Sequence, residues 1–411
     1  MGDIIVSIDI GSSKVCTLIG STDRNSGIEI VGRGMVSCGG VKKGIIVDTE
    51  STSASIKSSV EQAEAMAGMK VGSAYVSIAG MHVNVINNRS WINVSGENRE
   101  ITQKDVEKLL YTVRNIQLPE DRQIIDVIPR QYVIDGYDEI IDPVGMVGVR
   151  LEVDADIVAG KIISVQNIIK SLEKAGIKID GLIIGAFATG EVALTPDEKE
   201  IGVLLIDVGG GITDISVFSK KRLEFYDSLP IGGDHITNDI AIGLKIPYAE
   251  AEKIKRQYEL ALTSLIKNDQ EISVTDVNDG KKKNVKVSEV VEIIEARVYE
   301  IFSLTRGMLE KSGVNVKLDA GIVLAGGGIS YVDGCKQLAN EVFEMPVRIS
   351  SYSFSGASKP EYATAAGIIK YVSGMHKSGR ISSDVKKQKQ IPIGGEVNIF
   401  GKFLRFLGKL F

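Results

Sequence analysis

Two short stretches of the chain carry an aspartate, a glycine turn and hydroxyl side chains in the same order. One runs from Val6 to Lys14 (VSIDIGSSK) and the other from Leu204 to Asp214 (LLIDVGGGITD), and their aspartates lie 198 residues apart. In each, an apolar run predicts a buried strand that ends at the glycines. Glycine tolerates positive φ and has no Cβ, so such a turn can bring several backbone N–H groups close to one phosphate. The two stretches predict a pair of loops that enclose the phosphates of a nucleotide.

The polar side chains of both stretches suit a magnesium nucleotide. Hydroxyl groups can donate to phosphate oxygens and a lysine adds positive charge; these residues are Ser12, Ser13, Thr213 and Lys14. Mg²⁺ usually keeps several waters and takes one or two protein carboxylates. We therefore expect Asp9 and Asp207, at the two strand ends, to hold Mg²⁺ through its waters. The alternative is a pair of ordinary β-hairpins, because Asp-x-Gly is also turn chemistry, but the repetition with matching flanks favours phosphate binding.

A third glycine cluster follows another apolar run, from Gly321 to Ile329 (GIVLAGGGI), and a helix is expected from Tyr331 to Val342. A flat purine could lie on such a backbone, although a simple strand-to-helix turn is the alternative. In order and spacing, the three stretches resemble the actin, Hsp70 and sugar-kinase superfamily, which has two phosphate loops and an adenosine loop. The resemblance extends to residues 232–241 (GGDHITNDIA) and 251–255 (AEKIK), and in the superfamily the last of these supplies ribose and adenine contacts.

This resemblance implies ATP and Mg²⁺ as cofactors. The residues that it assigns to nucleotide binding are Asp9, Gly11, Ser12, Ser13, Lys14, Asp207, Gly209, Gly210, Gly211, Thr213, Gly233, Asp234, Glu252, Lys255, Gly326, Gly327 and Gly328. Many members that hydrolyse ATP carry a glutamine or glutamate at the start of the interdomain helix, to position the attacking water. This chain has Gly185-Ala-Phe-Ala-Thr189 there, and Glu191 is the nearest weak candidate. Since positioned proton acceptors typically contribute about 10²–10⁴-fold, we expect an ATP-binding protein with at most slow ATPase activity.

Composition agrees with a cytoplasmic protein of two or more buried domains. The chain has 411 residues, 44% of them hydrophobic, and a formal net charge of −5, so no large basic field favours nucleic acid. Its three cysteines form no C-x-x-C or Cys/His cluster and are expected to be reduced thiols. Asp3 and Asp9 interrupt the first apolar run, which argues against a signal peptide. No run of about 20 apolar residues could span a bilayer.

Strands and amphipathic helices alternate along the chain, which predicts an α/β architecture. Strands are expected at 4–10, 15–21, 28–36, 73–79 and 179–184, and helices at 52–66, 162–175, 185–194 and 288–312. Residues 83–157 form a separate inserted unit, with strands near 83–86, 91–94 and 123–134 and a helix at 103–114. A hairpin is expected at 271–287, and the segment from Pro360 to Gly367 should begin the helix that crosses back to the first domain.

The end of the chain has a different composition. Residues 376–396 are polar, basic and rich in glycine, as in a flexible linker. Residues 397–411 are predicted to form an amphipathic helix: at about 100° per residue the apolar side chains would cover an arc of roughly 160°, and the basic ones an arc of roughly 60° on the other side. This pattern is typical of a helix that lies in the membrane plane on anionic lipid; the alternative is a helix docked on the protein's own core. The membrane-facing and lipid-binding candidates are Phe400, Phe403, Leu404, Phe406, Leu407, Leu410, Phe411, Lys402, Arg405 and Lys409.

An actin-like core, an inserted unit and a terminal basic amphipathic helix together resemble the FtsA family, bacterial cell-division proteins that tether FtsZ filaments to the membrane. The resemblance implies a filament-forming peripheral protein on the cytoplasmic side of the cell membrane at the septum. Its partners would be the FtsZ C-terminal peptide, further copies of itself, anionic lipids and, through subdomain 1C, other divisome proteins, with no nucleic acid. Arg297 lies where the family places an arginine near the FtsZ peptide, and Arg306 is a weaker candidate.

The fold implied is an actin-like (ribonuclease H-like) two-domain ATPase with an inserted 1C subdomain and a C-terminal amphipathic helix. Its expected divisions are 1A at 1–82 and 158–192, 1C at 83–157, 2A at 193–230 and 301–358, 2B at 231–300, the returning interdomain helix at 359–375, the linker at 376–396 and the membrane helix at 397–411. Two alternatives remain. One is a PilM-like adaptor of a pilus or secretion machine, and the other is a small-molecule kinase; the basic terminal helix argues against both.

Overall fold

The computed structural model describes residues 3–23, 27–96, 98–352 and 356–377. The chain divides into two compact units, residues 1–371 and 372–411, and the description below concerns the first. The predicted membrane helix at 397–411 lies wholly outside the described residues, and the predicted linker at 376–396 lies almost wholly outside them.

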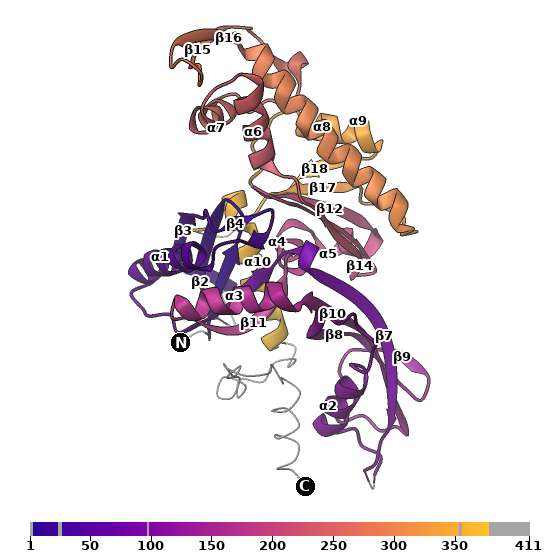
Figure 1. The fold of residues 1–411 in the computed structure, drawn as a ribbon. Helices are drawn as coiled ribbons and strands as arrows, with labels where there is room; N and C mark the ends of the chain where they lie inside the picture. Colours follow the sequence, from indigo (N-terminus) through magenta and orange to yellow (C-terminus); the bar gives the residue numbers. More distant parts are fainter. Residues whose placement is uncertain (1–2, 24–26, 97, 353–355, 378–411) are drawn as a thin grey trace. The chain divides into compact units, whose positions relative to one another are not determined.

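Two five-stranded sheets with the same strand order form the centre of residues 1–371 (Figure 1). The orders are β3-β2-β1-β6-β11 and β14-β13-β12-β17-β18. In both, three consecutive strands pair antiparallel and two further strands pair in parallel. The bounds are β1 Asp3–Ile10, β2 Lys14–Asp23, β3 Gly27–Ser37, β6 Ser73–Ile78, β11 Lys178–Ile184, β12 Val203–Val208, β13 Thr213–Ser219, β14 Arg222–Leu229, β17 Ile322–Ala325 and β18 Val347–Ile349. The duplication seen in the sequence therefore extends to whole sheets, and each candidate phosphate loop follows a central strand.

Helices pack on these sheets through small residues and apolar stripes. Helix α1 (Thr49–Ala67) begins at Asp48, whose carboxylate accepts from the amides of Glu50 and Ser51. It lies close against β3, because a Cβ on Gly34 would overlap the backbone of Ser59. Helix α8 (Val287–Ser312) buries residues three or four apart, and its buried stripe shares one core with β12, β13 and β17. This spacing is the α-helical period that predicted the helix.

Further helices and short strands lie along the chain between and after the strands of the two large sheets. They are β4 Val41–Lys42, β5 Ile45–Ile46, η1 Gly80–His82, α3 Ile162–Lys174, α4 Gly185–Ala193, α5 Pro196–Ile201, α6 Gly233–Gly243, α7 Tyr248–Gln257, η2 Thr263–Leu265, β15 Glu271–Thr275, β16 Lys282–Lys286, α9 Cys335–Phe343, η3 Pro360–Tyr362 and α10 Ala363–Lys377. Strands β15 and β16 form the predicted hairpin, and α4, α8 and α10 confirm three predicted helices.

The chain segment between β6 and α3 forms a separate sheet, with the strand order β7-β10-β8-β9. Its elements are β7 Val83–Asn93, α2 Gln103–Thr112, β8 Arg122–Ile134, β9 Tyr137–Ile140 and β10 Arg150–Lys161. Helix α2 and three of these strands share a core of their own that includes Ile92, Leu109 and Leu151. The inserted sheet also reaches the second large sheet, because the Arg130 guanidinium donates to the Leu223 carbonyl at 3.0 Å.

Two predicted boundaries are wrong, each for a local reason. The two strands expected at 83–86 and 91–94 are one strand, because Asn87 and Arg89 between them donate to Asp154 on β10. The helix expected from Tyr331 begins only at Cys335. Before it, Asp333 pairs with the backbone at 259–261 and Gly334 takes a φ of 91°, so this segment cannot be helical.

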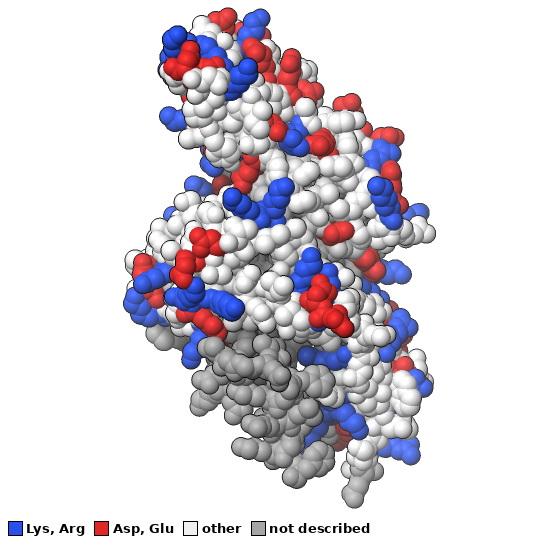
Figure 2. All heavy atoms as spheres, in the orientation of Figure 1, with Lys and Arg blue, Asp and Glu red and all other residues white. Residues whose placement is uncertain are grey.

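Charges of both signs are mixed on one face of the described residues (Figure 2). On the face shown in Figure 2, Lys and Arg are interspersed with Asp and Glu among the described residues. No helix in the described ranges combines the length and the apolar character needed to cross a membrane.

Candidate nucleotide-binding site

The two candidate phosphate loops have the same backbone geometry. In the first, the Gly11 amide donates to the Lys14 carbonyl at 2.9 Å, and in the second, the Gly209 amide donates to the Ile212 carbonyl at 2.9 Å. Each loop joins antiparallel strands by a four-residue turn. The stretches are thus β-hairpins, which was the alternative interpretation. Hairpin geometry and phosphate binding are compatible, since successive backbone amides of a turn can form a concave anion-binding site.

The loops face each other across a very short gap. A Cβ on Gly210 would overlap the Ser13 side chain, and a Cβ on Gly211 would lie 2.5 Å from the Ser12 hydroxyl oxygen. The Ser13 hydroxyl donates to the Asp234 carboxylate at 2.8 Å, which connects the first loop to the start of α6. Glycine is therefore required in the second loop by the approach of the first. The structure brings together the serines and glycines that the sequence predicted for phosphate binding.

Three half-buried carboxylates, Asp9, Asp207 and Asp214, lie on different strands next to the loops. Ser77 donates to Asp9 at 2.7 Å, Thr189 donates to Asp207 at 2.8 Å, and Ser228 donates to Asp214. Asp207 and Asp214 are opposite each other in the register of β12 and β13. Each of the three aspartates thus has a hydroxyl donor, and charged neighbours shift its pKa.

Burial dominates the electrostatics of this group. Loss of solvent raises the pKa of Asp207 to about 6 and that of Asp214 to about 7, and neighbouring carboxylates add to both shifts. Burial also raises the pKa of Asp9, while the Ser77 hydrogen bond and the Lys14 charge oppose that rise. An uncompensated buried charge is unfavourable, so a cation near these groups would favour their ionised forms.

The predicted nucleoside-binding residues also come together. Gly326 follows β17, and its φ of 89° and its contact with Asp207 exclude a side chain there. A Cβ on Gly233 would lie 3.0 Å from the Cα of Gly328, so the start of α6 touches the third glycine cluster. On α7, Lys255 pairs with Glu252 at 2.7 Å and donates to the Gly233 carbonyl at 3.1 Å.

Some predicted residues have other roles in the structure. Thr213 is buried, and its hydroxyl donates to the Ile231 carbonyl at 2.8 Å, so the hydroxyl proton is already engaged within the second half of the chain. Glu191 pairs with Lys199 on α5 at 2.7 Å and does not join the carboxylates next to the loops. Glu191, the weak catalytic candidate, is therefore held by an ion pair with α5 and is not positioned beside the loops.

Arg297 and Arg306 do not share one site. They are nine positions apart on α8, which at about 100° per residue places them on opposite faces. Arg297 donates to Asp239 on α6 at 2.9 Å and also pairs with Glu300. Arg306 pairs with Glu310 at 3.0 Å and lines a shallow groove between α8 and α9.

Sequence reasoning missed several residues of this group. Ser77 and Thr189 carry no local signal, because each is far along the chain from the aspartate that it contacts. Asp214 could have been found: a four-residue turn between paired strands places residues 207 and 214 opposite each other. The tip of the β4–β5 hairpin, which contacts both loops, was also missed.

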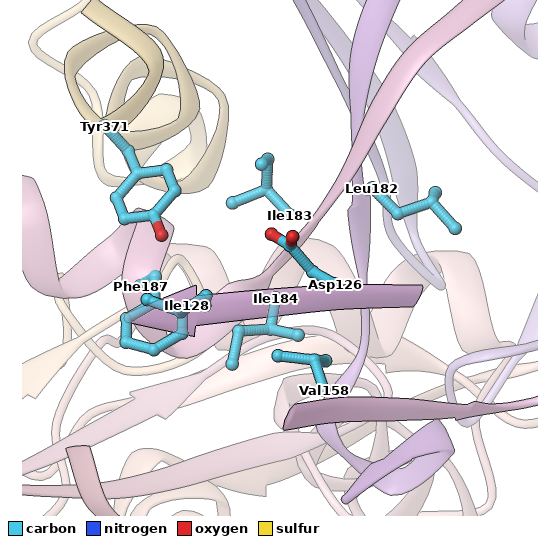
Figure 3. A pocket seen from close by; sticks show the side chains of 8 residues that line it. All are labelled: Asp126, Ile128, Val158, Leu182, Ile183, Ile184, Phe187 and Tyr371. Carbon is cyan, nitrogen blue, oxygen red and sulfur yellow. The ribbon is translucent and has the colours of Figure 1, made fainter. Parts of the chain in front are cut away.

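A second hollow, away from the loops, is unsuited to a nucleotide. It lies where β8 and β10 of the inserted sheet meet β11, α4 and α10, and its lining is apolar except for Asp126 and Tyr371 (Figure 3). The Phe187 and Tyr371 rings stack beside it, with centroids 5.6 Å apart. No glycine turn reaches it among the residues that line it. The loops and the carboxylates next to them therefore remain the candidate site.

Comparison with known proteins identifies the family. A model described as "Cell division protein FtsA" matches residues 204–367, and one described as "SHS2 domain inserted in FTSA" matches residues 80–159. The chain is 37% identical to the cell division protein FtsA of Pseudomonas aeruginosa, over 90% of this chain and 89% of that one. It is 31% identical to FtsA of Escherichia coli K12, over 98% of this chain and 97% of that one. The chain belongs to the FtsA family.

Solved structures support the same fold. The PilM–PilN type IV pilus biogenesis complex matches with a TM-score of 0.60 and 18% identity, over 90% of this chain and 98% of that one. MreB5 of Spiroplasma citri bound to ADP matches with a TM-score of 0.54 and 15% identity, over 94% and 99%. At these identities the likeness shows only the fold. It confirms the actin-like architecture, and the SHS2 match confirms an inserted domain of the FtsA family.

Proposed function

We propose that this FtsA-family chain binds Mg-ATP between its two glycine loops. The observation that carries this proposal is the duplicated sheet, which brings two hairpin turns, Gly11–Lys14 and Gly209–Ile212, face to face beside three half-buried carboxylates. A nucleotide in the related fold of MreB5 adds support. Asp9 and Asp207 would hold Mg²⁺ through its waters, and Mg²⁺ would neutralise phosphate charge. This arrangement fits the half-buried carboxylates, because loss of solvent disfavours their charge and a cation would compensate it.

The adenosine would lie on the Gly326–Gly328 backbone, with Glu252 and Lys255 of α7 at the ribose. Gly233 and Asp234, at the start of α6, would face the phosphates together with Ser12, Ser13 and Lys14. The subdomains proposed are 1A at 1–82 and 158–192, 1C at 83–157, 2A at 193–230 and 301–358, and 2B at 231–300. Because no glutamine or glutamate of α4 is positioned beside the loops, hydrolysis would be slow.

The wider function proposed is a membrane tether for FtsZ. The chain would polymerise on the cytoplasmic membrane at the septum, with ATP selecting the assembly-competent state. Membership of the FtsA family supports this proposal. Many copies, each with one amphipathic helix at 397–411, would hold the membrane firmly through avidity.

Co-sedimentation with anionic vesicles tests the tether. The full chain and a chain ending at Glu396 are compared in Mg-ATP, Mg-ADP and EDTA. We expect the full chain to pellet and to form filaments on vesicles in Mg-ATP, and the shortened chain to stay unbound. If both stay in the supernatant in every condition, the membrane function is wrong.

FtsZ-peptide binding is proposed at Arg297, with Arg306 as the alternative. Each arginine serves as the control for the other, because both belong to α8 but lie on opposite faces of it. Titration with an FtsZ C-terminal peptide should show about a tenfold loss of affinity in Arg297→Ala, and little change in Arg306→Ala, if the charged contact is at Arg297. The reverse pattern would assign the peptide to the α8–α9 groove. Family membership favours this function over a PilM-like adaptor or a kinase.

A further inference from the structure

The tip of the β4–β5 hairpin touches both candidate phosphate loops. The Gly44 amide donates to the Ser12 hydroxyl oxygen at 2.9 Å, which joins the tip to the first loop. The Lys43 amide nitrogen lies 3.2 Å from where a Cβ on Gly211 would be, and the Ile212 side chain lies beside Gly44. The tip therefore contacts the second loop as well. The start of α6 also meets both loops, since Asp234 accepts from Ser13 and its amide donates to the Gly210 carbonyl at 2.8 Å.

The tip is fixed in position by two features. His82 Nε2 and the Gly44 carbonyl oxygen form a hydrogen bond of 2.8 Å, and His82 Nδ1 lies 3.1 Å from the Ser164 hydroxyl. Lys43 and Gly44 have φ values of 49° and 73°, as in a type I′ turn. That turn favours Asn, Asp or Gly at its first position. A lysine is not among these residues, although the β13–β14 turn of this chain also has lysines, Lys220 and Lys221, at φ values of 50° and 59°.

The Lys43 side chain carries a charge that nothing in the described part of the chain neutralises by a salt bridge. The side chain is exposed, and its charge helps to lower the pKa of His235, after the larger effect of burial. His235 lies at the start of α6, next to Asp234, which accepts from Ser13. The Lys43 backbone thus lies beside both loops, and its charge acts on the start of α6.

Lys14, the lysine predicted from the sequence, lies in a different place. A Cβ on Gly327 would be 3.3 Å from its ammonium nitrogen, and its charge acts on Asp9, Asp207 and Glu361. Lys14 therefore faces the carboxylates next to the loops. Lys43 is instead an exposed residue beside Ser12 and Gly211, where the two loops face each other.

We propose that Lys43 is a further phosphate-binding residue, which contacts the terminal phosphate of a bound nucleoside triphosphate and so distinguishes ATP from ADP. This inference rests on the proposed nucleotide binding. A lysine ammonium is a compact point charge that binds phosphate well. ADP lacks the terminal phosphate and would leave Lys43 without a partner, so the contact contributes to ATP affinity alone.

Nucleotide titration of the full chain tests the proposal. Lys43→Asn removes the charge but keeps a residue that suits the type I′ turn. Lys42→Asn is the matched control, because Lys42 is the exposed neighbour on β4. Dissociation constants for Mg-ATP and Mg-ADP are measured by calorimetry for each variant. We expect Lys43→Asn to weaken Mg-ATP about tenfold or more and to leave Mg-ADP within about twofold. Lys42→Asn should change neither.

The outcomes separate this inference from the proposed function. A wild-type chain that binds neither nucleotide would overturn both. A wild-type chain that binds both, with a Lys43→Asn variant that binds Mg-ATP unchanged or loses both nucleotides equally, would overturn only the role of Lys43. If Lys43→Asn does not fold, Lys43→Gly takes its place, since glycine adopts positive φ without strain. Lys43→Arg, which keeps the charge, should retain most of the preference for ATP.

Discussion

Asp207 and Asp214 have the most unusual titration behaviour in the candidate site. Burial raises their pKa values to about 6 and about 7, from a usual value near 3.8. Between about pH 4 and pH 7 the folded chain therefore binds more protons at these groups than the unfolded chain. Their contribution to the free energy of unfolding falls as the pH rises through this window. The site thus lowers stability at neutral pH, unless a cation compensates the charge.

Replacing Asp214 with Asn should stabilise the nucleotide-free chain at high pH. Asparagine keeps the shape and can still accept from Ser228, but it carries no charge. We expect a gain of about 1–3 kcal/mol at pH 8 and a much smaller gain at pH 5. Urea unfolding at the two pH values measures it. Asp138→Asn, at an exposed position with no such environment, should show no difference between the two. An equal effect of Asp214→Asn at both pH values would contradict the raised pKa.

The pKa of Asp207 also predicts how Mg-ATP binding depends on pH. Mg²⁺ favours the ionised carboxylate, so affinity should fall as the pH drops through about 6. Between pH 7.5 and pH 5.5 the ionised fraction falls about fourfold, and the affinity should follow it. Asp207→Asn should weaken Mg-ATP binding and remove this part of the pH dependence. If the variant shows the same pH dependence as the wild type, the carboxylate does not act on the metal.

At the scale of the elements, the sequence predicted what local patterns determine. Strands β1, β2, β3 and β6 follow apolar runs, and α8 follows a helical period, and all are present. The sequence pattern predicted two strands in place of β7, because the residues between them, such as Asn87 and Arg89, are polar. An edge strand tolerates polar residues when a neighbour such as Asp154 pairs with them. Strand β10 was not predicted at all. Its pairing with β7 and β8 depends on residues far away in the chain.

Two helical glycines provide a test of packing between elements. A Cβ on Gly367 of α10 would overlap the backbone of Ala188 on α4, whereas Gly307 of α8 has nothing within 4 Å of such an atom. Gly367→Ala should therefore destabilise the chain by about 2 kcal/mol or more, because the helices must separate. Gly307→Ala should stabilise it by about 0.5–1 kcal/mol, because alanine favours the helix. Chemical denaturation compares them. Equal effects at both positions would show that α4 and α10 are not in close contact.

At the scale of the whole molecule, the duplication of the two loops made the site predictable. Two similar motifs in one chain implied that they face each other, and the matching sheets explain why they do. Three contributors could not be predicted in this way. Ser77, Thr189 and Gly44 reach the site only because β6, α4 and the β4–β5 hairpin fold against the loops. No periodicity in the sequence encodes such long-range contacts.

Hydrogen–deuterium exchange of the full chain, with and without Mg-ATP, tests the central claim most directly. If the nucleotide lies between the loops, peptides that contain residues 9–14, 207–214, 232–237 and 325–329 should exchange more slowly together when Mg-ATP is bound. Peptides from the inserted sheet at 122–134 serve as the internal control and should change little. Tight binding of Mg-ATP without protection of both loops would contradict the account, because the phosphates would then lie elsewhere.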